Sequence, residues 1–194
     1  GCGEEPQPTP KFDATLMMTN LAHNHFVPAV GQLDEDAKKL YGATQKWCAA
    51  LGTADEAAKL SGAQAAWKTI MATWQRVELM KIGPLAASSG ALRDDIYSWP
   101  TASACAVDQG VGKLKLEPNF PIQDMLVNWR GLDALEYLLF APSLDTQCPD
   151  SAKPPLWDVL SKTDKAKARC TYALLVAANA GGHIATLKHA WATD

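Results

Sequence analysis

Two carboxylates, Asp133 and Glu136, have the spacing in this chain that points most directly to chemistry. They lie three positions apart within residues 128–140, whose apolar pattern is typical of an amphipathic helix. Side chains three apart on a helix are neighbours, so two acids at this spacing repel each other unless a proton, a cation or a metal ion intervenes. The pattern therefore predicts a site, with Asp133 and Glu136 as candidate metal ligands.

A third carboxylate, Glu78, falls on the apolar face of a helix predicted over residues 55–82. A buried carboxylate is costly unless it is paired, protonated or bound to metal. Metal-binding helical bundles place acids at such inward positions, so we expect Glu78 to be a further metal ligand. Spacing alone leaves an alternative open, a set of buried ion pairs with the nearby arginines Arg76, Arg93 and Arg130.

Two neighbours of the paired acids are expected to contribute to binding. Trp129 shares the helix face of Glu136, and Arg130 is a candidate charge partner for the carboxylates. The four histidines are not expected to bind metal. Positions two or six apart point in different directions on a helix, so they are predicted to be solvated or singly hydrogen-bonded: His23, His25, His183 and His189.

The elements that must position these side chains are predicted to be helices throughout, because no useful strand alternation appears. A long helix is expected over residues 12–51, kinked near Pro28. A long ordered loop is expected over residues 100–123. The other predicted helices cover residues 55–82, 85–98, 122–140, 155–161 and 164–191. Four to five long helices make an all-α helical bundle the expected fold class.

Composition excludes several classes of partner. The chain has 194 residues, 47% of them hydrophobic, and a formal net charge of −3. It contains no run of lysine or arginine, so nothing indicates a nucleic acid partner. No apolar stretch approaches the ~20 residues that a transmembrane helix needs.

The first residues predict an anchor instead. Residues 1–11 are rich in proline and polar residues and are interpreted as a flexible tether, which leaves residues 12–194 as the helical domain. Cys2 at the start of such a tether resembles the lipidated cysteine of a mature bacterial lipoprotein, which would attach the protein to a membrane. The alternative is a cloning remnant with an incidental cysteine.

The remaining four cysteines are expected to form two disulfides, because they make no metal-binding spacing. We expect Cys148–Cys170 and Cys48–Cys105, the first because it closes a short local loop. Disulfides indicate an oxidising compartment outside the cytoplasm. Free thiols in a cytoplasmic protein are the alternative.

Three segments together resemble the imelysin-like family of bacterial periplasmic proteins and lipoproteins. They are residues 65–84, 96–100 and 130–140, and the resemblance extends over about residues 12–191. It implies an all-helical fold of two bundle-like halves, a periplasmic or cell-surface location and a link to iron or other metal uptake. This chain resembles the first half, so a second helical half or a partner subunit is expected to cover the apolar face that ends at Trp191.

The family signature Gly-x-His-x-x-Glu falls on Gly131, Asp133 and Glu136, so this chain has aspartate where the family has histidine. That departure weakens the family's proposed metallopeptidase chemistry, since zinc hydrolases usually rely on histidine ligands. Carboxylates still suit oxygen-preferring cations such as iron or calcium. The leading hypothesis is a lipid-anchored periplasmic protein that binds a metal or a metal-bearing ligand. A metallopeptidase using Glu136 and a non-catalytic partner-binding bundle are the alternatives.

Overall fold

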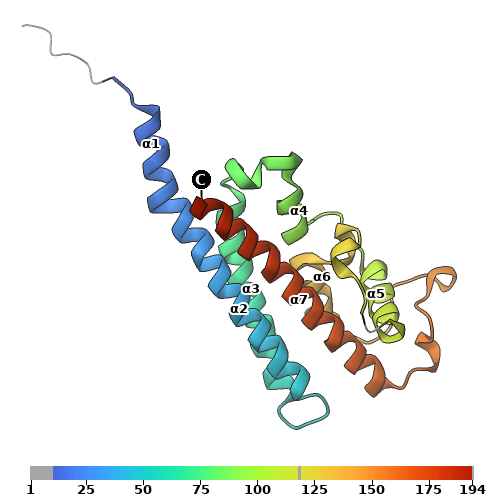
Figure 1. Cartoon of the computed structure of the whole chain (residues 1–194). Coiled ribbons are helices and arrows are strands. Elements are labelled where there is room, and N and C mark those ends of the chain that lie inside the picture. The colour runs from blue at the N-terminus through green and yellow to red at the C-terminus, as the bar shows by residue number, and fades with distance from the viewer. Residues whose placement is uncertain (1–10, 118, 194) are drawn as a thin grey trace, which may run out of the picture.

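A computed structural model describes residues 11–117 and 119–193, and this part of the chain forms a helical bundle without strands. Its longest helices are α2 (Val27–Ala49), α3 (Glu56–Glu78) and α7 (Lys162–Thr193). Helix α2 packs along both α3 and α7, and the three run side by side through the length of the molecule (Figure 1). The all-α bundle predicted from the sequence is confirmed.

The core lies where these helices meet α6 (Gly131–Phe140). Apolar residues recur at the three-to-four spacing along each helix and so form one buried stripe. The side chains at the centre have no solvent exposure at all, among them Leu33, Ile70, Trp74, Leu135, Ile184 and Leu187. Burial of these stripes is the main source of stability for helices of this kind.

The first predicted helix is helical along most of its length but has an irregular turn. Helix α1 (Ala14–Leu21) runs through a π-helical turn (Ala22–Phe26) directly into α2, and α1 projects beyond the bundle (Figure 1). Pro28 follows the wide turn and lies in the first turn of α2. Proline has no amide N–H to donate, and a π-turn is a common way to absorb such an interruption.

The structure overturns the long loop predicted at residues 100–123. Helix α5 (Ala104–Leu116) occupies its centre. The prediction failed because Gly110 and Gly112 read as helix breakers, whereas here they allow close packing. A Cβ atom at Gly110 would collide with the Tyr172 hydroxyl, and one at Gly112 would lie 2.7 Å from Cβ of Pro154.

Two predicted helices are shorter than expected. Only α4 (Ala91–Ile96) forms within residues 85–98, and only α6 forms within residues 122–140. The adjoining segments, and the helix predicted over residues 155–161, contain single 3₁₀ turns. These 3₁₀ turns are Gly83–Leu85, Ala87–Gly90, Ile122–Asp124, Val127–Trp129 and Trp157–Val159, and a further 3₁₀ turn lies at Asp150–Ala152.

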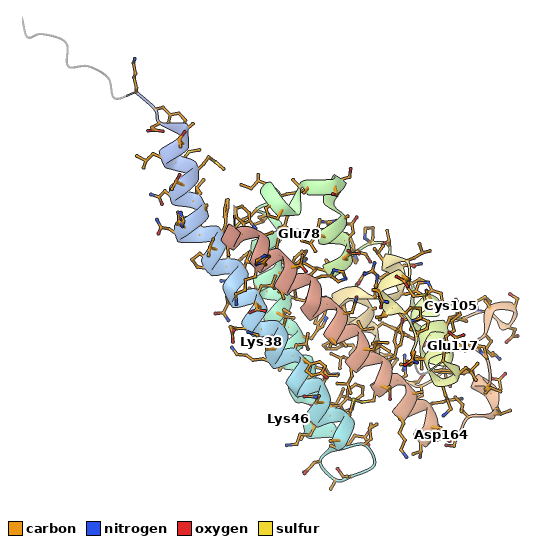
Figure 2. All side chains as sticks on the ribbon, in the orientation of Figure 1. Lys38, Lys46, Glu78, Cys105, Glu117 and Asp164 are labelled. Atoms are coloured by element: carbon orange, nitrogen blue, oxygen red, sulfur yellow. A yellow bond between two sulfur atoms is a disulfide. The ribbon has the colours of Figure 1, made fainter. Side chains whose placement is uncertain are left out.

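The four cysteines form two disulfides as predicted, but the predicted pairing is wrong. The bonds are Cys48–Cys170, with Cα atoms 5.5 Å apart, and Cys105–Cys148, with Cα atoms 4.5 Å apart. The first joins α2 to α7, which lie side by side, and the second joins α5 to the loop after α6 (Cys105 is labelled in Figure 2). Proximity in the bundle decides the pairing, and proximity in sequence does not.

Trp191, expected to lie on an uncovered face, packs within the chain. Its ring meets Phe26 edge-on at a centroid distance of 5.2 Å and also covers Gly83. None of the helices in the described ranges is long and apolar enough to cross a membrane. Cys2 and the predicted tether lie outside the described residues, apart from Lys11.

The two disulfides should differ in their contribution to stability. Cys48 and Cys170 are 122 residues apart, against 43 for the other pair, so their bond restricts the unfolded chain more. Replacing Cys48 and Cys170 by alanine should lower the free energy of unfolding by about 3–5 kcal/mol, and replacing Cys105 and Cys148 by about 1 kcal/mol less. Urea unfolding of both variants measures the difference, and an equal or reversed order would contradict the chain-entropy argument.

Candidate functional site

The candidate site begins at the sharp start of helix α6. Arg130 is extended, and Gly131 has φ +90°, a left-handed conformation that favours glycine. A Cβ atom at Gly131 would lie 2.7 Å from Oδ1 of Asp133 and 3.1 Å from the Ile96 carbonyl oxygen. The glycine therefore lets the chain enter α6 close to α4 and leaves room for the Asp133 carboxylate.

Asp133 is buried and held by hydrogen bonds. Ser98 Oγ donates to its Oδ2 at 2.6 Å, and the backbone N–H of Ala134 donates to its Oδ1 at 3.0 Å. Burial raises the pKa of the Asp133 carboxyl, and these hydrogen bonds oppose that rise. No arginine or lysine forms an ion pair with Asp133 in the part of the chain that the structure describes.

Glu136 lies one turn further along α6 and is half-buried. Within residues 11–117 and 119–193, its carboxylate has neither a hydrogen bond nor an ion pair. Burial raises the pKa of Glu136, and the neighbouring charge of Asp133 raises it further. The described residues therefore offer the Glu136 carboxylate neither a cation nor a hydrogen-bond donor, so it can bind a cation or a proton from solution.

Glu78 has a partner of its own. Arg93 Nε donates to Glu78 Oε1 at 2.9 Å, and Arg93 also pairs with Asp94. Both side chains are about three-quarters buried. The ion-pair alternative considered from the sequence thus describes Glu78, whereas Arg76 donates only to Ala72 and Thr73.

Tyr97 lies within electrostatic reach of all three predicted acids. Burial raises the pKa of the Tyr97 hydroxyl, and Glu136, Asp133 and Glu78 raise it further in that order, while Arg93 opposes them. The helices therefore bring the three carboxylates to one region around Tyr97, although they come from α3 and α6. The region carries more negative charge than Arg93 alone offsets.

Arg130 faces away from the paired acids. Its Nη2 donates to Asp95 Oδ1 at 2.7 Å, and its Nη1 donates to His183 Nε2 at 3.0 Å. Burial lowers the pKa of His183 and Arg130 lowers it further, against the opposing charge of Asp95. A neutral imidazole that accepts from Arg130 fits this arrangement, so Arg130 joins α4, α6 and α7 in one buried network.

Trp129 is also engaged with other side chains. It stacks on Phe120 at a centroid distance of 6.3 Å, and Lys113 Nζ lies 5.0 Å above its ring. Its carbonyl oxygen accepts from the Tyr172 hydroxyl. The two predicted binding residues, Trp129 and Arg130, therefore fix the approach to α6 by contacts within the bundle.

The residues present do not make a complete metal site by themselves. In the described ranges no group of three or more His, Cys, Asp or Glu side chains is placed to hold a metal ion. Within these ranges Glu136 has no partner, Asp133 accepts hydrogen bonds from Ser98 and Ala134, and Glu78 accepts from Arg93. A cation bound here would need further ligands from outside these residues.

Sequence reasoning missed the residues that organise the site from a distance. Ser98 and Tyr97 belong to the segment 96–100 that carries the family resemblance, and that resemblance was a usable signal. Asp95 and His183 gave no local signal, because they meet Arg130 only through the packing of α4, α6 and α7.

Comparison with known proteins identifies the family. The imelysin family model matches residues 26–194. This chain belongs to the imelysin family. An imelysin-like protein from Psychrobacter arcticum 273-4 has the same fold, with a TM-score of 0.65 at 18% sequence identity.

The structural match covers 91% of this chain and 49% of the other, so the chain spans about half the length of that imelysin-like protein. No curated protein matches the sequence. The family signature thus lies at the start of α6, where Gly131 shapes the turn, Asp133 is buried and Glu136 is free.

Replacing Gly131 by alanine should lower the free energy of unfolding by about 2–3 kcal/mol, because a Cβ is strained at φ +90° and displaces the Asp133 carboxylate. Gly62→Ala is the matched control. Gly62 lies inside α3 with open space around it, so alanine there should leave stability unchanged or raise it by about 0.5–1 kcal/mol. Urea unfolding of the two variants measures both effects, and similar values would remove the argument for Gly131.

Asp133→Asn should lower the pKa of Glu136 toward that of an ordinary glutamate without reaching it. The substitution removes the neighbouring charge but leaves the burial that raises the pKa most. Carbon-detected NMR titration of the glutamate carboxyls measures the shift, with exposed Glu117 as the internal control. A Glu136 pKa that does not move would mean that Asp133 carries no charge while Glu136 titrates.

The same variant should alter the pH dependence of stability. A raised pKa means that the folded protein binds the proton more tightly than the unfolded chain does. The contribution of Asp133 and Glu136 to the free energy of unfolding is therefore present in full below the pKa of the unfolded chain. It is lost as the pH rises through the raised pKa values of the folded protein. Asp133→Asn should reduce this loss, as urea unfolding between about pH 4 and 7 would reveal.

Proposed function

We propose that this imelysin-family protein acts outside the cytoplasm, anchored by a lipid on Cys2, and binds a metal-bearing ligand through Glu136 in a process linked to iron or other metal uptake. The observation that carries the proposal is the half-buried carboxylate of Glu136, which lacks a partner in the described part of the chain beside a second buried acid. The two disulfides support an oxidising compartment.

A metal that arrives within a ligand fits this site better than a bare ion. A bare cation needs several protein donors, which the described residues do not gather. A chelated cation brings most of its own donors and has only one or two positions to fill. Glu136 supplies one such oxygen, and Asp133 adds negative charge close behind it.

The partner in this proposal is a second helical half, in the same polypeptide or in another subunit. Helix α1 and the residue before its cap leave large apolar side chains in solvent, with Phe12 76% and Leu16 66% exposed. Such a patch is typical of an interaction surface.

Peptidase chemistry has less support from the geometry. Asp133 stands at the position of the family's histidine and is held by Ser98 and Ala134. Histidines His23 and His25 lie on the exposed π-turn, and His183 is engaged with Arg130. A casein-cleavage assay with and without a chelator tests this alternative, and chelator-sensitive cleavage that is lost in Glu136→Gln would favour it over binding alone.

Titration calorimetry with ferric nitrilotriacetate tests the proposal, because this chelate leaves coordination positions open. Ferric EDTA, which encloses the ion, is the matched ligand control, and free calcium and zinc ions test the bare-cation reading. We expect the open chelate to bind and the closed one not to bind. Glu136→Gln should weaken binding at least about tenfold, whereas exposed Glu117→Gln, at the end of α5, should leave it unchanged (Figure 2).

Affinity for the open chelate should also decrease as the pH is lowered, because a proton on Glu136 competes with the cation. Since the pKa of Glu136 is raised, this loss of affinity should begin at a higher pH than for an ordinary glutamate. Absence of saturable binding, or equal binding by wild type and Glu136→Gln, would rule the proposal out.

A further inference from the structure

A cavity of about 640 Å³ lies at the other end of the bundle from Glu78. It is bounded by the end of α2, the start of α3, the end of α6 and the start of α7. Figure 2 labels Glu78 near the end of α3 and Asp164 near the start of α7, at opposite ends of the molecule. The volume falls within the range of small-molecule sites. One wall is apolar and includes Trp47, Leu51, Leu60, Leu138, Leu139 and Pro142.

The opposite wall is positively charged. Lys162, Lys165 and Arg169 all line it from the first turns of α7. The dipole of this 32-residue helix adds positive potential at its start, although Asp164 in the first turn opposes it. The cavity thus has an apolar side and a cationic side, which is the arrangement that suits an amphipathic anion.

Two acids also line the cavity, but both already accept hydrogen bonds. Glu56 Oε2 accepts from the backbone N–H of Gly52 at 2.7 Å. Asp145 Oδ2 accepts from Ser143 Oγ at 3.0 Å. Neither forms an ion pair with the three cations among the residues that the structure describes. The side chains that line the cavity therefore carry three positive and two negative charges, which leaves a small positive excess.

Arg169 is the cavity-lining cation whose hydrogen bonding is incomplete. Its side chain is only 3% exposed, and its Nη1 donates to the Ser143 carbonyl oxygen at 2.6 Å. Its Nε and Nη2 have no hydrogen-bond acceptor in the described part of the chain. Arg169 forms an ion pair with buried Asp108, whose Oδ1 lies 3.7 Å from Nη2, and its guanidinium lies 4.8 Å from the centroid of the Tyr137 ring. Asp108 also accepts from the Tyr137 hydroxyl and the Gln147 N–H.

A second buried donor lines the same cavity. Trp47 is 7% exposed, and its indole N–H also lacks an acceptor within the described residues. A buried donor without an acceptor costs about 1–3 kcal/mol, and more when the group is charged. Trp47 and Arg169 directly precede Cys48 and Cys170 in the sequence, so the disulfide between α2 and α7 holds the two donors on the same cavity.

We propose that this cavity binds a small amphipathic carboxylate. The apolar part of the ligand lies against Leu60 and Leu139, and its carboxylate is bound at the wall formed by Lys162, Lys165 and Arg169. The site is separate from Glu136 and takes a ligand of opposite charge. It does not depend on metal binding.

Calorimetric titration with decanoate, below its micelle concentration, and with 2-naphthoate tests the proposal and distinguishes an aliphatic from an aromatic ligand. Decanol is the neutral comparison. We expect saturable binding of at least one carboxylate at a single site, with decanol binding more weakly. Raising the salt concentration should weaken carboxylate binding, because the wall is partly open to solvent.

Three variants locate the site. Lys162→Gln with Lys165→Gln should weaken carboxylate binding at least about fivefold. Lys167→Gln is the matched control, since Lys167 lies on the same turns of α7, is exposed and does not line the cavity. Leu60→Glu, which places a negative charge on the half-buried apolar wall, should abolish binding.

Each outcome of these titrations either supports or contradicts the proposal. Saturable binding that is lost in the double lysine variant and in Leu60→Glu but kept in Lys167→Gln supports the site. Absence of saturable binding by either carboxylate would overturn the proposal. So would decanol binding as tight as decanoate binding, or affinity that the double lysine variant leaves unchanged. Far-ultraviolet circular dichroism of each variant confirms that it is folded.

Discussion

The burial of α7 is the constraint on which the rest of the structure depends. Helices α2, α4, α5 and α6 all pack against it. Tyr172, Val176, Ile184 and Leu187 are completely buried along its length. A helix surrounded in this way fixes its neighbours in relation to one another. It brings α4 and α6 close enough for Ser98 to reach Asp133, and it brings α2 close enough for the disulfide.

The candidate site follows from one backbone position within that frame. The chain turns into α6 so tightly at Gly131 that a Cβ atom there would collide with the Asp133 carboxylate and lie close to the Ile96 carbonyl oxygen. Asp133 is then buried and satisfied by Ser98 and its own helix, while Glu136, one turn later, is left half-buried without a partner. Gly131 and Asp133 therefore have a structural role at the start of α6, whatever Glu136 binds.

Sequence patterns predicted the features that depend on local periodicity. The long helices were predicted nearly to their ends, because apolar residues recur at helical spacing over many turns. The spacing of Asp133 and Glu136 predicted two neighbouring acids that repel each other, and the charge of Asp133 does raise the pKa of Glu136; that they bind a metal stays a prediction. Arg93 was among the arginines considered as partners for the acids, and it is the one that pairs with Glu78.

The features that sequence reasoning missed all depend on contacts between distant segments. Gly110 and Gly112 look like helix breakers until Tyr172 and Pro154 are packed against them. The cysteine pairing follows from the contact between α2 and α7, over 122 residues of chain. Residues 122–130 continue the apolar pattern of α6, but Gly131 at positive φ separates them from the helix. A one-dimensional pattern carries no information about which distant side chain meets a given position.

Two charged groups in the described part of the chain have incomplete pairing: Glu136 has no partner, and Arg169, although it is ion-paired with Asp108, keeps two donors without an acceptor. An unpaired carboxylate such as Glu136 and unpaired donors such as those of Arg169 both destabilise a folded chain. Glu136 lies on α6, whose start is fixed by the hydrogen bonds of Arg130 to Asp95 and His183. Arg169 lies on α7 next to Cys170, which is bonded to Cys48 of α2. These contacts hold the backbone around each group in place, while Glu136 keeps part of its side chain in solvent. A ligand of opposite charge at either position would offset part of this cost, as the two proposals require.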